Sequence, residues 1–133
     1  LGLGDRIRAT IPVELSLPAA GQGALGIEAL SSRPEVAAWL APLVCGPSEA
    51  CVRAERSVSR ALAGSCEVPL AAYCVVDGGA LWLRARVAMP DGSRIAAAEV
   101  RGNIAQPDEL AAQCVAALRA EGAQTILDAL DTR

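Results

Sequence analysis

The chain contains no histidine, no lysine and no phenylalanine in its 133 residues. Because histidine is the commonest general base and metal ligand, its absence excludes Ser–His, Cys–His and HExxH schemes built from this chain alone. All 12 positive charges are therefore arginines, whose planar fork binds carboxylates in a way that lysine cannot reproduce. With only 2 tryptophans and 1 tyrosine, aliphatic side chains and close backbone packing must fill the core.

Long apolar runs and an excess of positive charge are also missing. No run approaches the ~20 apolar residues that a transmembrane helix needs. The net charge of −3 argues against a protein that binds nucleic acid by neutralising phosphates. Residues 1–6 hold no initiator methionine and no charged-then-apolar signal pattern. These features predict a chain that begins inside a longer protein and binds neither membrane nor nucleic acid.

The 5 cysteines lack the spacing of a metal site or a disulfide framework. Their number is odd, their spacing is irregular and no CxxC motif occurs, so neither a zinc site nor paired disulfides are predicted. Free thiols are typical of a reducing compartment, which predicts a cytoplasmic protein. The cysteines are Cys45, Cys51, Cys66, Cys74 and Cys114.

The residues that are present predict a meander in the second half of the chain. Two turn motifs, at 77–79 (DGG) and 90–93 (PDGS), divide residues 68–101 into three antiparallel strands. A two-residue loop at 91–92 pairs Trp82 with Arg101 and Arg84 with Glu99 on one face. The other face is then wholly apolar, with the pairs Leu83–Val100, Ala85–Ala98 and Val87–Ala96. A loop at 78–79 likewise places Cys74 opposite Leu83, facing the core.

Four helices are predicted around this meander. The first has Ser32 or Arg33 as its cap and stops at residues 46–47, and the second runs from a Ser48 cap to Leu62. The third begins at Pro107 and ends at Gly122, and a short helix follows it. Each helix has an apolar stripe at helical spacing. The stripe of the first helix is Val36, Trp39, Leu40 and Leu43, and that of the second is Ala50, Cys51, Ala54, Val58, Ala61 and Leu62. The stripe of the third is Leu110, Ala111, Cys114, Val115 and Leu118, and that of the last is Ile126, Leu127 and Leu130. Residues 46–133 therefore read as a small α+β domain, a three-stranded antiparallel sheet covered by helices.

The first 45 residues give weaker signals. Residues 13–17 alternate like a short strand, and residues 24–30 read as a buried strand. The glycines in residues 21–26 (GQGALG) suit either a tight turn or a loop that faces a ligand. On the second helix, Glu49, Arg53, Arg56 and Arg60 form a charged stripe, and spacing favours a solvated face over a binding face.

Elimination leaves one thiol as the best candidate for chemistry. The periodicity puts Cys74 and Cys114 in the core and Cys51 on the apolar side of its helix, while Cys45 beside a Gly-Pro break could be exposed. Cys66 lies on a glycine-bounded turn between a helix and a strand, with Arg60 upstream to favour a thiolate. Burial as a packing residue and presentation as a nucleophile both remain open from the residues alone.

Several segments together resemble the porphobilinogen deaminase (hydroxymethylbilane synthase) family. They are residues 16–28 (SLPAAGQGALGIE), 54–56 (AER), 60–69 (RALAGSCEVP), 82–85 (WLRA) and 90–93 (PDGS). They occur in the family's order and spacing, over essentially the whole chain. Two departures are Ser65 and Ala71, where the family often has glycine.

The resemblance implies a three-domain transferase of tetrapyrrole biosynthesis. In this family a dipyrromethane cofactor, held by a cysteine thioether that matches Cys66, primes the condensation of four porphobilinogen molecules into hydroxymethylbilane with release of ammonia. Gln22 and Gly23 match a loop close to that cofactor. Residues 1–45 would be the ends of two α/β periplasmic-binding-protein-like lobes with the hinge loop, and residues 46–133 the cofactor-anchoring domain. The catalytic aspartate and most substrate-binding arginines would lie in the rest of the protein, so this chain alone is expected to be inactive.

Two other functional classes remain as hypotheses. One is a non-catalytic α+β module that binds an acidic partner through Trp82, Arg84, Arg86 and Arg101. The other is a thiol redox sensor, which needs a resolving cysteine within disulfide reach of Cys66, and Cys45 is the candidate.

Overall fold

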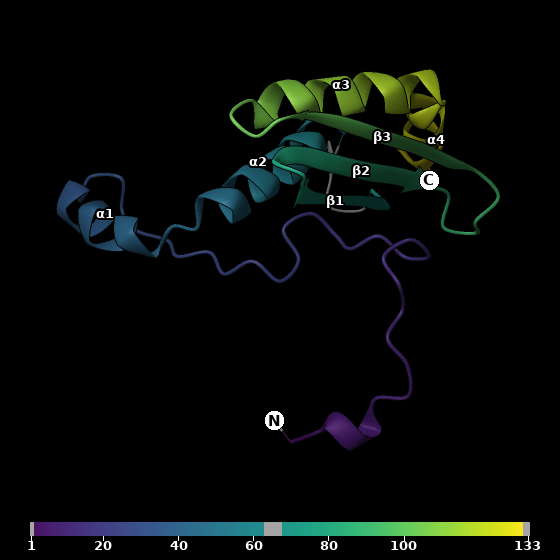
Figure 1. Cartoon of the computed structure of the whole chain (residues 1–133). Coiled ribbons are helices and arrows are strands. Elements are labelled where there is room, and N and C mark those ends of the chain that lie inside the picture. Colours follow the sequence, from purple (N-terminus) through teal and green to yellow (C-terminus); the bar gives the residue numbers. More distant parts are fainter. Residues whose placement is uncertain (1, 63–67, 132–133) are drawn as a thin grey trace.

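A three-stranded antiparallel sheet forms the centre of the fold (Figure 1). The computed structural model describes residues 2–62 and 68–131. Within them the strands are β1 (Leu70–Asp77), β2 (Ala80–Ala88) and β3 (Ile95–Asn103), in the order β1-β2-β3. The predicted meander and α+β class are confirmed.

The predicted register is confirmed pair by pair. Trp82 lies opposite Arg101, Arg84 opposite Glu99 and Cys74 opposite Leu83. The first turn is the two-residue loop Gly78-Gly79, and both glycines adopt the positive φ (59° and 84°) that this tight hairpin requires. The second turn is longer than predicted, because strand pairing ends at Ala88 and Ile95, although Met89 N still donates to Arg94 O at 2.9 Å.

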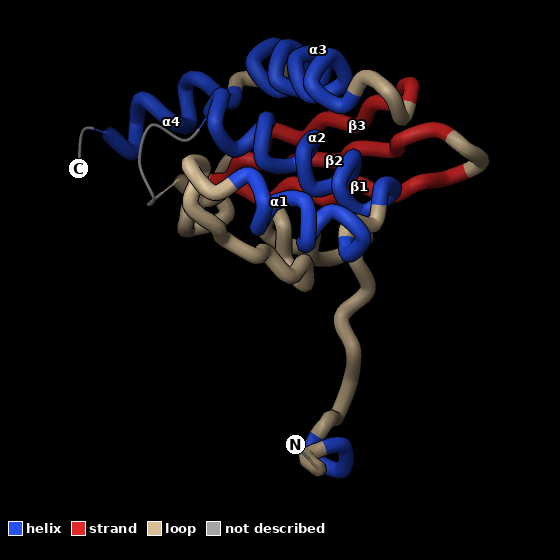
Figure 2. The backbone as a smooth tube through the Cα atoms, turned by 90° about the vertical axis from the view of Figure 1, so that its left-hand side faces the viewer, coloured by secondary structure: helices blue, strands red, loops and turns tan. Residues whose placement is uncertain are grey.

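Three helices bury the apolar face of this sheet (Figure 2). They are α2 (Gly46–Leu62), α3 (Pro107–Ala120) and α4 (Ala123–Asp131). The α3 stripe is buried as predicted, and Gly122 joins α3 to α4 with a φ of 88° that favours glycine. Fully buried side chains at the centre of this layer include Leu81, Leu83, Leu110 and Leu118.

The second helix begins two residues before the predicted cap. Gly46 and Pro47 lie in the first turn of α2 and do not interrupt the chain between two helices, since proline is compatible with the first turn of a helix. The carbonyl of Cys45 accepts the N–H of Glu49 at 2.8 Å, so Cys45, not Ser48, occupies the capping position. One member of the predicted stripe, Ala61, is exposed.

The first 45 residues differ most from the sequence-based predictions. Residues 13–17 form a turn and residues 24–30 an extended loop, so neither predicted strand is present. The first helix, α1 (Pro34–Leu40), ends six residues before the predicted stop, and a 3-10 turn (Ala41–Leu43) follows. Ala41 still has helical dihedrals, but Pro42 has no N–H to continue the helical hydrogen bonds. A strand needs a partner for its backbone groups, and no described segment pairs with these residues.

The predicted apolar stripe of α1 is not buried. Trp39 is 71% exposed and Leu43 68%, and Leu25 in the preceding loop is 98% exposed. The other two stripe residues, Val36 and Leu40, are only partly buried, so the described residues do not cover this face as a core would. The predicted division at residue 45 stays a prediction, although every residue of the buried core lies at position 54 or later.

Residues 13–17 cross the sheet on the side opposite the helices (Figure 1). Arg86 donates to the backbone carbonyl of Glu14 at 2.9 Å and to that of Leu15 at 3.4 Å. Arg84 forms an ion pair with the Glu14 carboxylate at 3.4 Å. The chain itself therefore occupies part of the arginine-bearing face of the sheet.

Candidate functional site

The loop at residues 19–23 is folded back on itself beside α2. Gln22 N donates to Ala19 O at 3.0 Å, and the Gln22 side-chain oxygen accepts from Ala19 N at 3.1 Å. Gly21 and Gly23 have φ values of 75° and 84°, which strongly favour glycine. Both interpretations of this glycine-rich segment survive, because it is a tight turn and it also borders a cavity.

Glu55 anchors this loop from the middle of α2. Its two carboxylate oxygens accept backbone N–H groups from Gly21 and from Cys74, each at 2.7 Å. The side chain is only 5% exposed, and burial raises the pKa of the Glu55 carboxyl, while the two backbone hydrogen bonds partly offset this rise. Helical periodicity could not reveal the residue as a structural anchor, because its partners lie 34 and 19 residues away.

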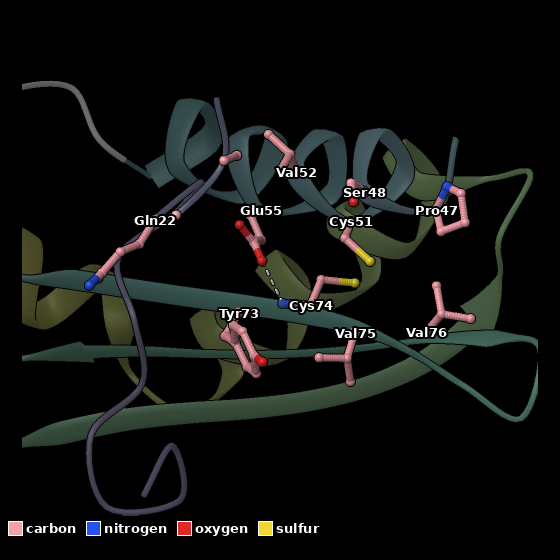
Figure 3. A pocket seen from close by; sticks show the side chains of 12 residues that line it. Gln22, Pro47, Ser48, Cys51, Val52, Glu55, Tyr73, Cys74, Val75 and Val76 are labelled. Atoms are coloured by element: carbon pink, nitrogen blue, oxygen red, sulfur yellow. Dashed lines mark hydrogen bonds between the residues drawn. The ribbon is translucent and has the colours of Figure 1, made fainter. Parts of the chain in front are cut away.

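A cavity of about 400 Å³ opens between the loop, α2 and β1 (Figure 3). Glu55, Cys51 and Cys74 point into the space between the helix and the strand, and Gln22 and Gly23 lie at its border. The structure therefore brings the two loop residues predicted to lie near a cofactor next to a buried carboxylate and two thiols.

The four described thiols differ in their capacity to react. Burial raises the pKa of Cys74 far above its ordinary value and that of Cys114 to about 11, and it also raises the pKa of Cys51. These thiols are poor nucleophiles because the thiolate is the reactive form. Exposed Cys45 is the exception, since the Ser48 hydroxyl donates to its sulfur at 3.2 Å and lowers the pKa of the thiol. Cys66, the predicted anchor, lies outside the described residues.

The charged stripe of α2 is exposed, as predicted, but its arginines are not equivalent. Arg53 Nε donates to Asp108 at 2.9 Å and so ties α2 to α3. Arg56 and Arg60, by contrast, border a second cavity of about 450 Å³ together with Gly21 and Ser59. Two guanidinium groups one turn apart, six and ten residues before Cys66, suit a ligand that carries carboxylates.

The face of the sheet opposite the helices carries a stacked cluster of arginine side chains and aromatic rings. The Arg84 guanidinium lies 4.0 Å from the Trp82 ring centroid and 5.3 Å from that of Tyr73, and Arg101 lies 4.5 Å from Trp82 on the same face. The predicted pairing of Arg101 with Trp82 as a cation–π contact is confirmed. Arg86, which the interaction-module hypothesis assigns to an acidic partner, donates to the chain's own residues 14 and 15.

Other classes of site receive no support from the described residues. No three histidine, cysteine, aspartate or glutamate side chains in residues 2–62 and 68–131 are grouped so as to hold a metal ion. Across the same described ranges, no helix combines the length and apolarity needed to cross a membrane.

The pKa of Glu55 gives a testable pH dependence. Burial raises the pKa of Glu55 in the folded state, so between about pH 4.5 and that raised pKa the folded chain holds a proton that the unfolded chain has lost. The free energy of unfolding therefore falls as the pH rises through this range, by at most about 1.4 kcal/mol per pH unit. We expect the free energy of unfolding of wild type minus that of Glu55→Gln to fall across this range in urea titrations. A difference that rises or stays constant with pH would contradict the buried, raised-pKa carboxyl. Glu49→Gln, which removes an exposed carboxyl from the same helix, is the matched control.

Comparisons with known proteins give a consistent result. A family model described as the porphobilinogen deaminase C-terminal domain matches residues 49–120. The porphobilinogen deaminase of Paraburkholderia phymatum is 53% identical over 135 residues, covering 99% of this chain and 41% of that protein. The Bordetella parapertussis and Ralstonia nicotianae proteins of the same name are 56% and 57% identical, each over 96% of this chain and over 40% and 37% of their own lengths. The chain thus spans about two fifths of the length of these relatives.

Proposed function

Since this chain belongs to the porphobilinogen deaminase family, we propose that it works as the C-terminal part of a porphobilinogen deaminase (hydroxymethylbilane synthase). Such an enzyme condenses four porphobilinogen molecules into hydroxymethylbilane and releases ammonia at each step. The observation that carries the proposal is identity above 50% to proteins of that name along nearly the whole chain. The interaction-module hypothesis has no such support.

The residues present fit the dipyrromethane cofactor of this family, which we assign to Cys66. When bound through a thioether, the cofactor supplies the primer to which successive pyrroles are added. Two observations support Cys66: burial makes three of the other four thiols poor nucleophiles, and the helix that leads to residue 66 bears exposed guanidinium groups at Arg56 and Arg60. The pyrrole acetate and propionate groups suit these guanidinium forks.

The described residues suit binding and orientation better than proton transfer. Glu55 is held by two backbone N–H groups at the inner side of the loop, and the chain has no histidine to act as a general base. We therefore assign no catalytic acid or base to this chain and expect that group to come from the part of the relatives that the chain does not match. Gln22 and Gly23 are proposed to contact the cofactor or the growing chain.

The remaining proposals concern organisation and location. Residues 1–45 are proposed to complete the two α/β lobes around the hinge, which would cover apolar side chains such as Leu25 and Trp39. Residues 46–133 are proposed to form the cofactor-anchoring domain. A cytoplasmic location is proposed because the described cysteines are free thiols.

A chimaera tests the proposed function. In this deaminase chimaera, the chain replaces the matching 40% of the Bordetella bronchiseptica relative, to which it is 56% identical over 127 residues. We expect the purified chimaera to consume porphobilinogen and release ammonia, and the 133-residue chain alone to do neither. The unmodified Bordetella protein is the control. A folded but inactive chimaera, or turnover by the chain alone, would contradict the proposal.

A further inference from the structure

We propose that Glu55 is a positioning residue that fixes the Gly21–Gly23 loop so that the Gln22 side-chain amide faces the ligand as a hydrogen-bond donor. This inference rests on the proposed function, because the ligand in question is the carboxylate-bearing pyrrole chain. It assigns a role to a residue outside the loop, at the centre of α2, that contacts the loop backbone and not the ligand.

The hydrogen bond from Gly21 to Glu55 has no counterpart in this loop. The other hydrogen bonds of residues 19–24 join them to one another, through Gln22 N, Ala24 N and the Gln22 side chain. Within the described part of the chain, the 2.7 Å bond to Glu55 is the one hydrogen bond that joins the loop to the rest of the protein, beside the apolar contact of Ala20 with the core. Loss of that bond would free the position of the turn without removing its internal hydrogen bonds.

Glu55 also joins the loop to strand β1 of the sheet. Its second oxygen accepts the N–H of Cys74, a buried residue at the centre of β1, so a single carboxylate joins the loop, α2 and the sheet. Figure 3 shows this arrangement, with Glu55 between the helix and the strand and Gln22 on the far side of the loop. Because α2 and β1 contribute to the packed core, the loop is held in place relative to that core.

The loop's own hydrogen bonds determine which end of Gln22 is available. The side-chain oxygen accepts from Ala19 N, so it is engaged within the turn. The amide nitrogen makes no hydrogen bond to the described residues and points away from Glu55. A primary amide nitrogen donates two hydrogen bonds, and a pyrrole carboxylate is an acceptor of matching chemistry.

A carboxylate is needed at position 55 because both of its partners are donors. Glutamine could accept one of the two N–H groups, but its NH₂ would face the other N–H. Alanine would leave both N–H groups without this acceptor. No cation pairs with Glu55 among the described residues, and its charge helps to raise the pKa of the Cys51 and Cys74 thiols. The two N–H groups therefore compensate the buried charge in part. The number of them that find an acceptor at position 55 falls from two with Glu to one with Gln and none with Ala.

Hydrogen exchange on the 133-residue chain tests the contact itself. We expect the Gly21 amide to exchange faster in Glu55→Gln and faster still in Glu55→Ala, while the Leu83 amide in the central strand keeps its protection. Glu49→Gln and Glu49→Ala, on the exposed face of the same helix, should change neither amide. Unchanged exchange at Gly21 in both Glu55 variants would overturn the proposal.

A measurement on the wild type covers the case in which a Glu55 variant does not fold. The amide chemical shifts of Gly21 and Cys74 should titrate together with the Glu55 carboxyl carbon, with one common midpoint. Separate midpoints, or amide shifts that do not respond to the carboxyl, would contradict a shared hydrogen-bond acceptor.

Kinetics of the deaminase chimaera test the positioning role. We expect kcat/KM to fall by on the order of 10- to 100-fold in Glu55→Ala and by less in Glu55→Gln, with Glu49 variants unchanged. If Glu55 acts through Gln22, adding Gln22→Ala to Glu55→Ala should cause little further loss, whereas independent roles would give additive losses. Additive losses, or Glu55 variants as active as the Glu49 controls, would overturn the proposal.

These experiments separate the two levels of inference. An inactive unmodified chimaera would count against the proposed function, and with it against a positioning role in that reaction. Hydrogen exchange would still decide whether Glu55 holds the loop. If the unmodified chimaera is active and its Glu55 variants keep the kcat/KM of the Glu49 controls, the proposed function stands and only the positioning role is refuted.

Discussion

Replacement of Cys66 by serine in the deaminase chimaera is expected to abolish both the bound cofactor and porphobilinogen turnover. The unmodified chimaera should exceed its sequence mass by two pyrrole units, and Cys66→Ser should show the sequence mass alone. The physical reason is that a serine hydroxyl is a weak nucleophile without an adjacent base, and this chain has no histidine to activate it. Intact-mass spectrometry and an ammonia-release assay measure the two effects on the same sample.

Cys45→Ser is the matched control for this prediction. Among the described thiols, Cys45 is the exposed one, and the Ser48 hydroxyl lowers the pKa of its thiol, so chemistry alone makes it the strongest rival to Cys66. We expect Cys45→Ser to keep the added mass and the activity. Loss of the mass increment in Cys45→Ser, or its retention in Cys66→Ser, would show that the anchor is assigned to the wrong residue.

The same pair of variants bears on the redox-sensor hypothesis. A disulfide between Cys45 and Cys66 would lower the mass of an oxidised sample by two hydrogens and would block addition to Cys66. An anchor already joined to carbon by a thioether cannot form that disulfide. The redox-sensor hypothesis therefore predicts a purified protein slightly lighter than its sequence mass, and the anchor hypothesis predicts one heavier by two pyrrole units.

The sequence predicted the second half of the chain well because its signals are local and agree with one another. Gly78 and Gly79 define a tight hairpin, and period-two alternation fixes which side chains of β2 face the helices. That hairpin sets the pairs of β1 with β2. The pairs of β2 with β3, including the Trp82–Arg101 stack, follow from the second turn: it is longer than predicted but stays centred on residues 91–92, so the register is unchanged. The α3 stripe follows from helical periodicity in the same way.

The failures in residues 13–44 have a common physical cause. Alternation or helical spacing shows that a segment can bury one face, but burial also needs a partner surface. The described residues do not cover residues 24–30 and the stripe of α1, so Leu25 and Trp39 are exposed and Val36 and Leu40 are only partly buried. Glu55 escaped prediction for a related reason, since its partners belong to a loop and a strand that only the folded chain brings to it.

A pair of leucine-to-alanine substitutions tests this distinction between the packed and the exposed apolar residues. Leu83 lies on the central strand, faces α2 and α3, and is 0% exposed. Leu83→Ala should lower the free energy of unfolding of the 133-residue chain by about 2–5 kcal/mol, through lost burial and the cavity left behind. Urea unfolding followed by far-UV circular dichroism measures it.

Leu43→Ala removes the same atoms from a side chain that is 68% exposed. In the 133-residue chain we expect it to change the free energy of unfolding by no more than about 0.5 kcal/mol. A cost equal to that of Leu83→Ala would mean that residues 34–43 belong to the same core as the sheet, contrary to the structure. In the deaminase chimaera the two costs should converge, because the proposed lobes would cover Leu43 and give its side chain the packing partners that the isolated chain lacks. A Leu43→Ala cost that stays near zero in the chimaera would contradict the assignment of residues 1–45 to those lobes.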